Sequence, residues 1–368
     1  MPIKVWDYLK EYGQEKKEIF SAIKKVLDSG WLILGENVKK FEEEFAKYCG
    51  VSYGVGVNSG TDALFLGLKA LGVGKGDEVI TVSNTAVPTV SAIVSTGAAP
   101  RFVDIGLETY LMDTSKIERV ITKRTKCILP VHLYGQCVNM QEVNNIAKKH
   151  NLKVLEDCAQ SHGAIFKGKK CGSMSDISAF SFYPTKILGG FGDGGMVMTS
   201  NKTLYAKLLR LRFYGMKKTY YAVEHGYNSR LDELHAAILR NKLAHLPSYI
   251  QTRIKLAQRY DKYLKDTGLV LPKTASGNGH VYYLYVCRHS RRDHIISELK
   301  KKGILLNISY PWPIHIMRGY RYLGYKKGDF VNTEKAAKEI FSLPMYPSLT
   351  LAEQDRVIRE LKAILGNL

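Results

Sequence analysis

The feature that most constrains the fold is a regular alternation of strand and helix patterns between residues 78 and 157. Short apolar runs predict strands at "DEVITVS", "APRFVDI", "TKCILPVHLYG" and "LKVLED". Helical patterns such as "TVSAIVSTG" and "MQEVNNIAKKHN" separate them. Strand–helix–strand units at this spacing wind in a right-handed sense and build a parallel sheet with helices on both faces. The sequence therefore predicts an α/β fold.

The pattern changes near residue 230. The stretch "SRLDELHAAILRNKLAHLPSYIQTRIKLAQRYDKYLK" predicts one or two long helices. After it come strand candidates "HVYYLYVC" and "GILLNIS", with helices near Ser290–Lys302 and Glu334–Phe341. A chain of 368 residues holds about two domains at about 150 residues each. We predict a large domain over residues 1–247, which includes an N-terminal helical segment, and a small α+β domain over residues 248–368.

Composition excludes several classes of protein. No apolar run reaches the ~18 residues of a membrane span, and the first twenty residues lack the apolar core of a secretory signal. The six cysteines are scattered without a CxxC pair, which argues against a zinc site and against a disulfide framework. This cysteine usage predicts a cytoplasmic protein.

The formal net charge of +20 allows more than one interpretation. The lysines are dispersed along amphipathic stretches, which is typical of solvated helix faces. An attraction for phosphorylated ligands is the second interpretation. A regulatory or nucleic-acid-binding protein remains an alternative, and it would need a clustered basic face and salt-sensitive binding.

Three polar features lie where ligands bind in open α/β sheets. Asp157 ends the strand pattern "LKVLED", and ligands sit beyond the carboxyl ends of such strands. The run "NSGT" at residues 58–61 precedes a strongly helical segment, whose free N–H groups would hold a phosphate. Lys186 lies between the strand pattern "ISAFSF" and the glycine-rich "GGFGDGG", where the backbone can approach a ligand closely.

Together these features fit pyridoxal phosphate. Its ring nitrogen needs an anion such as Asp157, its aldehyde needs a lysine such as Lys186, and its phosphate suits a helix N-terminus. Each feature also has an ordinary interpretation as a structural aspartate, a surface lysine or a helix cap. The P-loop spacing is absent from "GVGKGD", and no strand–helix crossover frames "GGFGDGG" as a dinucleotide site.

The combination of motifs resembles the DegT family of sugar aminotransferases. The motifs, in the family's order and spacing, are "NSGTDAL", "EDCAQSHGA", "SFYPTK" with "GDGG", and "GYNSRLDELHAAIL". The resemblance covers nearly the whole chain, from "SGWLILGENVKKFEEEFAKYCG" to "SLPMYPSLT". It implies a fold-type I pyridoxal-phosphate enzyme, with a large, mostly parallel seven-stranded sheet between helices and a smaller C-terminal α+β domain.

The resemblance also implies roles for single residues. Lys186 would form the Schiff base with the cofactor and carry a proton between cofactor and substrate, and Asp157 would pair with the ring nitrogen. Asn228, in "GYNSRL", would reach the phosphate from a second subunit, so that a homodimer shares its active sites. The other expected cofactor contacts are Gln160 at the ring hydroxyl and, at the phosphate, Gly60, Thr61 and Ser181. No metal site is predicted.

Lysine at position 186 favours transamination, because relatives with histidine there act as sugar dehydratases. The resemblance implies a ping-pong cycle with L-glutamate as donor and a nucleotide-linked keto-sugar as acceptor, for a surface glycan or glycosylated product. The segments "NISYPWPIHIMRGYRYLGY" and "VHLYGQ" are most similar to members that act at C-3 of a dTDP-linked 6-deoxyhexose, while C-4 stays open. His315 would lie near cofactor and sugar, and Tyr183 and Tyr310 would line the sugar pocket.

One position departs from the family pattern. Many members place an aromatic side chain over the cofactor ring in the segment that reads "SNTAVPTV" here, and the matching residue is Ala86. Either another side chain, such as His162, stacks on the ring or the alignment slips by a residue.

Overall fold

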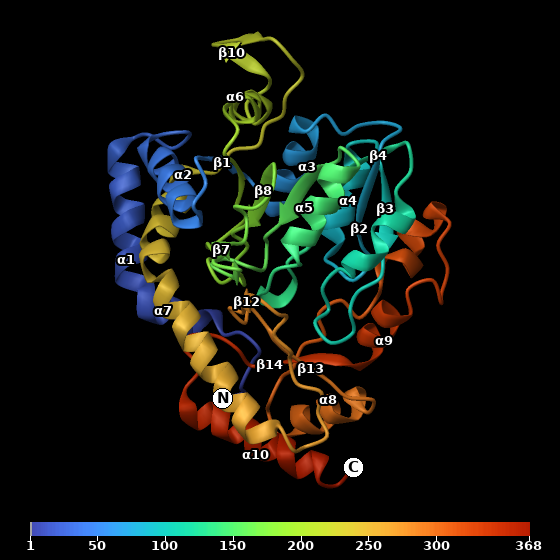
Figure 1. Cartoon of the computed structure of the whole chain (residues 1–368). Helices are drawn as coiled ribbons and strands as arrows, with labels where there is room; N and C mark the ends of the chain where they lie inside the picture. The colour runs from blue at the N-terminus through green and yellow to red at the C-terminus, as the bar shows by residue number, and fades with distance from the viewer. Residues whose placement is uncertain (1) are drawn as a thin grey trace.

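A seven-stranded sheet forms the centre of the computed structural model, which describes residues 2–368 (Figure 1). Its strand order is β1 (Tyr53–Val57), β9 (Gly195–Thr199), β8 (Ile177–Ser181), β5 (Lys153–Asp157), β4 (Thr125–Ile128), β2 (Glu78–Val82) and β3 (Ala99–Val103). Only β9 runs antiparallel to its neighbours. Strands β2, β8 and β9 are buried along their whole length, as expected for a sheet covered on both faces. The predicted mostly parallel seven-stranded α/β sheet is confirmed.

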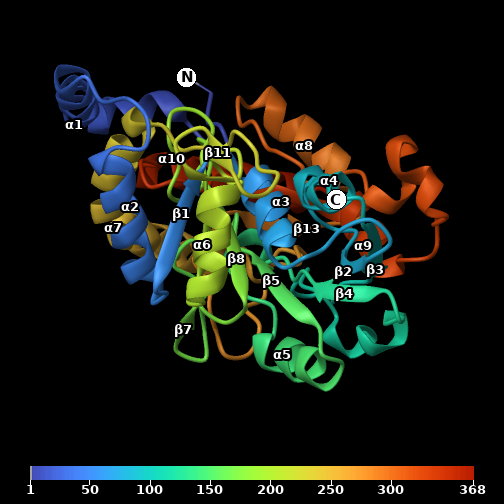
Figure 2. The ribbon, with the colours of Figure 1, turned by 90° about the horizontal axis from the view of Figure 1, so that it is seen from above.

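Helices cover both faces of this sheet. Figure 2 shows α3 and α5 on opposite sides of it. The helices of the first 211 residues are α1 (Tyr8–Ser29), α2 (Glu36–Cys49), α3 (Gly60–Ala70), α4 (Val87–Ser95), α5 (Met140–Lys149) and α6 (Lys202–Leu211). Several of these helices begin at a residue whose side chain caps the helix. At α5, for example, the Asn139 side chain accepts the backbone N–H of Glu142.

One long helix, α7 (Glu233–Leu264), connects the large sheet to a second layer (Figure 1). It continues through Pro247, so of the two predicted options the single helix is confirmed. The second layer comprises β13 (Tyr285–Arg288), α8 (Arg292–Lys301), α9 (Val331–Glu339), β14 (Ile340–Leu343) and α10 (Leu351–Leu365). The proposed division near residue 247 falls inside α7 and stays a prediction.

The C-terminal strands differ from the predicted ones. The segment "GILLNIS" forms no strand, because Ile304 and Asn307 make only single bridges, to Ile3 and Ser342. Instead β13 pairs with β14, and β14 occupies the end of a segment that had been predicted as helix. Ile3 also joins the hydrophobic cluster of this layer, so the start of the chain packs beside residues that follow it by three hundred positions.

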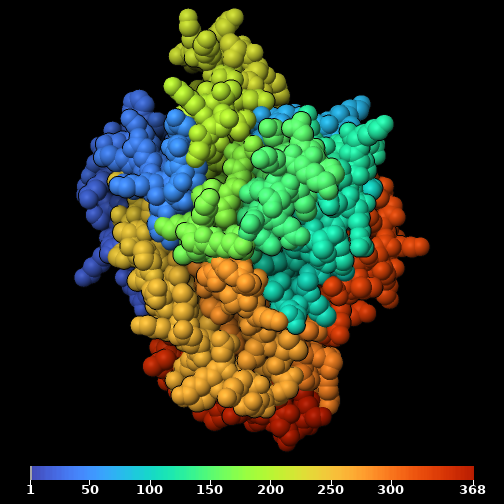
Figure 3. Space-filling view, in the orientation of Figure 1, coloured from blue at the N-terminus to red at the C-terminus, as the bar shows by residue number. Residues whose placement is uncertain are grey.

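A short hairpin projects from the body of the protein after α6 (Figures 1 and 3). Its strands are β10 (Met216–Lys218) and β11 (Tyr221–Ala222). Tyr220 is 95% exposed and Tyr221 is 64% exposed, so this arm presents apolar rings to its surroundings. A further small sheet joins β12 (Asn278–Gly279), β6 (Ile165–Phe166) and β7 (Lys169–Lys170). The 3₁₀ turns are η1 (Thr114–Lys116), η2 (Glu118–Val120), η3 (Leu133–Gly135), η4 (Ile314–Ile316) and η5 (Arg318–Leu323).

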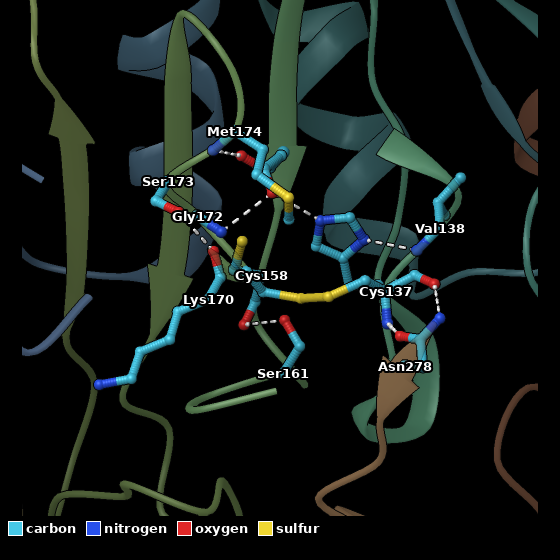
Figure 4. The surroundings of a disulfide bond; sticks show 12 residues. Cys137, Val138, Cys158, Ser161, Lys170, Gly172, Ser173, Met174 and Asn278 are labelled. Carbon is cyan, nitrogen blue, oxygen red and sulfur yellow. Dashed lines mark hydrogen bonds and ion pairs between the residues drawn. A yellow bond between two sulfur atoms is a disulfide. The ribbon is translucent and has the colours of Figure 1, made fainter. Parts of the chain in front are cut away.

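A disulfide joins Cys137 to Cys171 across 34 residues (Figure 4). The prediction that the cysteines form no disulfide was therefore wrong for this pair, because the fold brings together two residues that no local spacing connects. The other four cysteines are buried and free. The donor atoms of His132 and both bridged cysteines lie within 4.8 Å of one another. Among the helices of residues 2–368, none combines the length and the apolar character that a membrane crossing requires.

Candidate active site

Asp157 lies at the carboxyl end of β5 and is buried, with 4% of its surface exposed. Its Oδ1 accepts the backbone N–H of Ala159 at 3.1 Å, and its Oδ2 accepts the hydroxyl of Thr89 at 2.8 Å. Thr89 in turn lies 2.9 Å from the hydroxyl of Thr85. Burial raises the pKa of this carboxyl, while the two hydrogen bonds and the charge of Lys186 oppose the rise. A cation placed against Asp157 would therefore be strongly favoured.

The start of α3 forms an anion cradle against the end of β8. The Ser59 side chain caps the helix by accepting the N–H of Asp62, whereas the N–H groups of Gly60 and Thr61 form no hydrogen bond within residues 2–368. A Cβ atom at Gly60 would lie 2.5 Å from the Cβ of Ser181, so only glycine allows this approach. Two free N–H groups and a serine at a helix N-terminus suit a phosphate.

Lys186 follows β8 on a loop that begins with a turn, since its N–H donates to the carbonyl of Tyr183 at 2.9 Å. Its Nζ lies 5.0 Å from the ring centroid of Tyr283. Its positive charge opposes the rise in the pKa of Asp157 that burial causes, and it adds to the lowering of the pKa of His162 by burial, so Lys186 lies close enough to influence both groups. The structure thus brings the predicted lysine, aspartate and phosphate cradle to one edge of the sheet.

Gln160 ties together two tyrosines with unusual backbone conformations. Its side-chain oxygen accepts the N–H of Tyr134 at 2.9 Å, and its amide nitrogen donates to the hydroxyl of Tyr310. Tyr134 has φ of 59° and Tyr310 has φ of 65°, a region that costs a residue other than glycine about 1–2 kcal/mol. Such outliers persist where the surroundings hold them, commonly at functional sites. Tyr310 was predicted for the sugar pocket, whereas no local signal pointed to Tyr134.

The other predicted residues lie in different environments. Tyr183 is 51% exposed and close to Ser181, whose hydroxyl accepts its N–H at 3.3 Å. Asn228 is exposed at the base of the projecting arm, where it pairs with Phe213. The roles predicted for both residues stay predictions.

His315 is completely buried, and both of its ring nitrogens have partners. Nδ1 lies 2.7 Å from the hydroxyl of Ser83, at the end of β2, and Nε2 lies 3.1 Å from a carboxylate oxygen of Glu334. Because Ser83 also accepts the N–H of His315, its hydroxyl proton is free to donate to Nδ1. His315 thus fixes the end of β2, and its predicted contact with substrate stays a prediction.

Ala86 stands where the family pattern predicts an aromatic side chain over the cofactor ring. Ala86 is the N-cap residue of α4. His162 is completely buried against Phe45, Phe180 and Phe182, with ring centroids 5.3–6.2 Å away. Among residues 2–368, neither of its nitrogens has a hydrogen-bond partner. Burial lowers the pKa of His162 to about 3, so the ring is neutral.

A lysine, a buried carboxylate and a phosphate cradle at one sheet edge define a pyridoxal-phosphate enzyme of the aminotransferase class. Comparison with known proteins supports this assignment. Residues 13–362 match the DegT/DnrJ/EryC1/StrS aminotransferase family. The chain is 52% identical to a dTDP-3-amino-3,4,6-trideoxy-alpha-D-glucose transaminase of Micromonospora megalomicea subsp. nigra, over 99% of each chain. The chain belongs to this aminotransferase family.

Solved structures agree with this membership. DesV of S. venezuelae, solved in complex with a ketimine intermediate, superposes with a TM-score of 0.98 at 40% identity, over 100% of this chain and 99% of DesV. The ntda protein of Bacillus subtilis, solved with its bound cofactor PMP, has a TM-score of 0.90 at 34% identity. That match covers 96% of this chain and 82% of ntda. The free N–H groups at Gly60 and Thr61 and the buried carboxylate of Asp157, which forms no ion pair within residues 2–368, fit the same cofactor here.

Proposed function

We propose that this protein transfers the amino group of L-glutamate to C-3 of a dTDP-linked 3-keto-6-deoxyhexose. The observation that carries the proposal is the convergence of Lys186, Asp157 and the Gly60 cradle at one sheet edge. The 52% identity to a transaminase of a dTDP-3-amino sugar supports the substrate class. Transfer to C-4 of a UDP- or dTDP-linked 4-keto-sugar is a less supported alternative.

Most residues of the proposed site would bind the cofactor, and Lys186 would also transfer a proton. Bound pyridoxal phosphate supplies an electron sink for negative charge on the carbon that carries the amine. Asp157 would hold the ring nitrogen in its protonated form, because a buried carboxylate favours a cation beside it. Gln160 would bind the ring hydroxyl, and Gly60, Thr61 and Ser181 would bind the phosphate. Lys186 would anchor the cofactor through Nζ and then move a proton at that atom.

A homodimer with shared active sites is part of the proposal. The arm that carries Asn228 extends away from the body of its own chain, and its exposed rings at Tyr220 and Tyr221 suit burial against a second copy. Asn228 would then reach the phosphate cradle of the partner. We further propose that Tyr183, Tyr310 and His315 contribute to the sugar pocket, and that the enzyme acts in the cytoplasm.

The test replaces Lys186 by alanine and compares the variant with Lys255→Ala, which removes an exposed lysine of α7. Wild type and Lys255→Ala should convert glutamate and keto-sugar, with the visible absorbance of a lysine-linked cofactor. Lys186→Ala should lose that absorbance and at least ~10²–10⁴-fold of its rate, the usual contribution of a positioned proton carrier. Full activity of Lys186→Ala would refute the assignment.

The acceptor is identified with a panel of 3-keto and 4-keto nucleotide sugars, whose products are read by NMR. Amination at C-3 supports the proposal, and exclusive amination at C-4 overturns the proposed regiochemistry. Salt-sensitive duplex binding in a gel shift, without bound cofactor, would instead favour the nucleic-acid alternative.

A further inference from the structure

A cavity of about 340 Å³ lies between the start of the chain, α7 and the second layer. Figure 1 shows the N-terminal segment beside β14 and the lower half of α7. The cavity is lined by Val5, Trp6, Thr185, Arg253, Tyr283, Leu284, Leu305, Leu306, Asn307, Ser309 and Met345. Its lining is mixed, with one cation and several hydroxyl and amide groups among apolar side chains.

This cavity shares a wall with the proposed active site. Thr185 directly precedes Lys186, and the Thr185 hydroxyl lies 3.2 Å from that of Tyr283. The Nζ of Lys186 lies 5.0 Å from the ring centroid of the same Tyr283. A small molecule in the cavity would therefore contact Thr185 and Tyr283, two residues that neighbour the reactive lysine.

Arg253 is the cation of the cavity, and its charge is poorly compensated. Only 3% of its surface is exposed. Its three hydrogen bonds all leave from Nη1, to the carbonyls of Tyr282 at 3.2 Å, Tyr283 at 3.1 Å and Met345 at 2.8 Å, while Nε has no partner. Within residues 2–368, no carboxylate oxygen lies within 4.0 Å of its guanidinium. A buried cation without a paired anion is costly, and burial lowers the pKa of Arg253 to about 10.

Glu11 is the acidic neighbour of this arginine, and it is a weak counter-ion. Its Oε2 accepts the indole N–H of Trp6 at 2.7 Å rather than a guanidinium N–H. Burial raises the pKa of the Glu11 carboxyl, although that hydrogen bond and the charge of Arg253 oppose the rise. An incoming anion would thus meet a guanidinium that the protein itself does not neutralise.

We propose that this cavity binds a carboxylate of the amino donor, with Arg253 as its cation and the hydrogen-bonded hydroxyl pair of Thr185 and Tyr283 as a further donor. The volume lies near the lower end of the ~300–1,000 Å³ usual for ligand sites, which suits a small amino acid better than a nucleotide-linked sugar. Nη1 already donates to three carbonyls and Nε is buried, so Nη2 is the guanidinium nitrogen left to meet the carboxylate, in a charge-assisted hydrogen bond. The inference rests on the proposed function, since it assigns the donor half of the reaction.

The first test measures binding without turnover. Glutarate, a dicarboxylate that lacks the amine, is titrated into the wild-type protein by calorimetry, and glutaramide serves as the neutral control. Glutarate should bind and glutaramide should not. Arg253→Lys should weaken glutarate binding by about 10- to 100-fold, as expected when charge-assisted hydrogen bonds are lost. The matched control is Arg259→Lys on the same helix, whose arginine is paired with Asp355 and should be dispensable.

The second test separates a binding role from a structural one. In Arg253→Lys, the KM for glutamate should rise at least tenfold, while the KM for the nucleotide sugar stays within about twofold. Equal changes in both KM values, or unchanged glutarate binding, would overturn the proposal. If Arg253→Lys fails to fold, the proposal is tested with Thr185→Val and Tyr283→Phe, each of which should weaken glutarate binding about 3- to 10-fold. If the wild-type protein binds glutarate but transfers no amino group from any donor, the proposed function is refuted, whereas the assignment of an anion-binding site is still supported.

Discussion

Opening the disulfide between Cys137 and Cys171 should destabilise the protein without unfolding it. Both cysteines are buried, and Figure 4 shows the bridge surrounded by a hydrogen-bonded core. Cys137 exchanges two hydrogen bonds with the side chain of Asn278, and His132 bonds both Glu156 and the N–H of Val138. These contacts do not depend on the sulfur–sulfur bond. Reduction should therefore mainly restore freedom to the unfolded chain.

The stability lost on reduction of the disulfide follows from the length of the loop that the bridge closes. The bridge spans a sequence separation of 34 residues. The chain-entropy relation gives a loss of about 13 cal/mol/K for a loop of that size, or about 4 kcal/mol at 25 °C. With an unfolding entropy of about 2.1 cal/mol/K per residue, 4 kcal/mol corresponds to a melting shift of about 5 °C over 368 residues.

The assay is a thermal melt of the cofactor-free protein with and without a thiol reductant, after a thiol count on the denatured chain. Four reactive thiols are expected before reduction and six after it, because four cysteines are free. The reduced protein should melt about 5 °C lower. The double variant Cys137→Ala, Cys171→Ala should melt at one temperature in both buffers. Six thiols in the unreduced chain, or an equal reductant effect on the double variant, would refute the reasoning.

Two further predictions concern buried polar groups. Thr89→Val removes the hydroxyl that donates to Asp157 and should weaken cofactor binding about 5- to 10-fold in an absorbance titration. Thr252→Val, which removes the hydroxyl of a half-buried threonine on α7, should leave cofactor binding unchanged. Equal affinities of Thr89→Val and the wild type would exclude a role for the Thr89–Asp157 bond. Burial lowers the pKa values of His162 and His280 to about 3, from 6.5 in the unfolded chain. Below pH 6.5 the unfolded state therefore binds more protons than the folded state, and the stability of the protein falls as the pH drops from 6.5 towards 3. Each histidine should lower the free energy of unfolding by about 2 kcal/mol at pH 5. In denaturant melts at pH 7 and pH 5, His162→Phe should therefore lose about 2 kcal/mol less stability between the two pH values than the wild type does. A pH dependence equal to that of the wild type would contradict a buried, neutral His162 ring.

The sequence predicts those parts of the fold that depend on local periodicity. Strands such as β2 and β5 contain short apolar runs bounded by turn residues, so their existence and parallel direction follow from the alternation with helices. The pairing of β13 with β14 does not follow, because it joins residues 285–288 to residues 340–343 and replaces a predicted helix end. The projecting arm was also missed, since its strands contain only three and two residues.

The same distinction applies to the site. Asp157, Ser181 and Gly60 could be predicted because each ends or begins a local element and a motif marks it. Thr89 reaches Asp157, Tyr134 reaches Gln160 and Tyr283 reaches Thr185 only through the tertiary fold. Nothing in the immediate sequence of these three residues distinguishes them from packing residues. The disulfide belongs to this second group.

The stagger of two strands explains why these anchors can serve one flat ligand. β5 and β8 run parallel, and Asp157 pairs with Ala179. Ser181 therefore lies two residues further along, about 6–7 Å at the rise of a strand, and there it meets the start of α3 at Gly60. A cofactor with a cationic ring at one end and a phosphate at the other needs two such anchors set apart along a single edge. A shift of one residue in the β5–β8 register would turn Asp157 to the opposite face of the sheet while leaving the cradle in place. The register of these two strands is thus the structural condition on which the proposed chemistry depends.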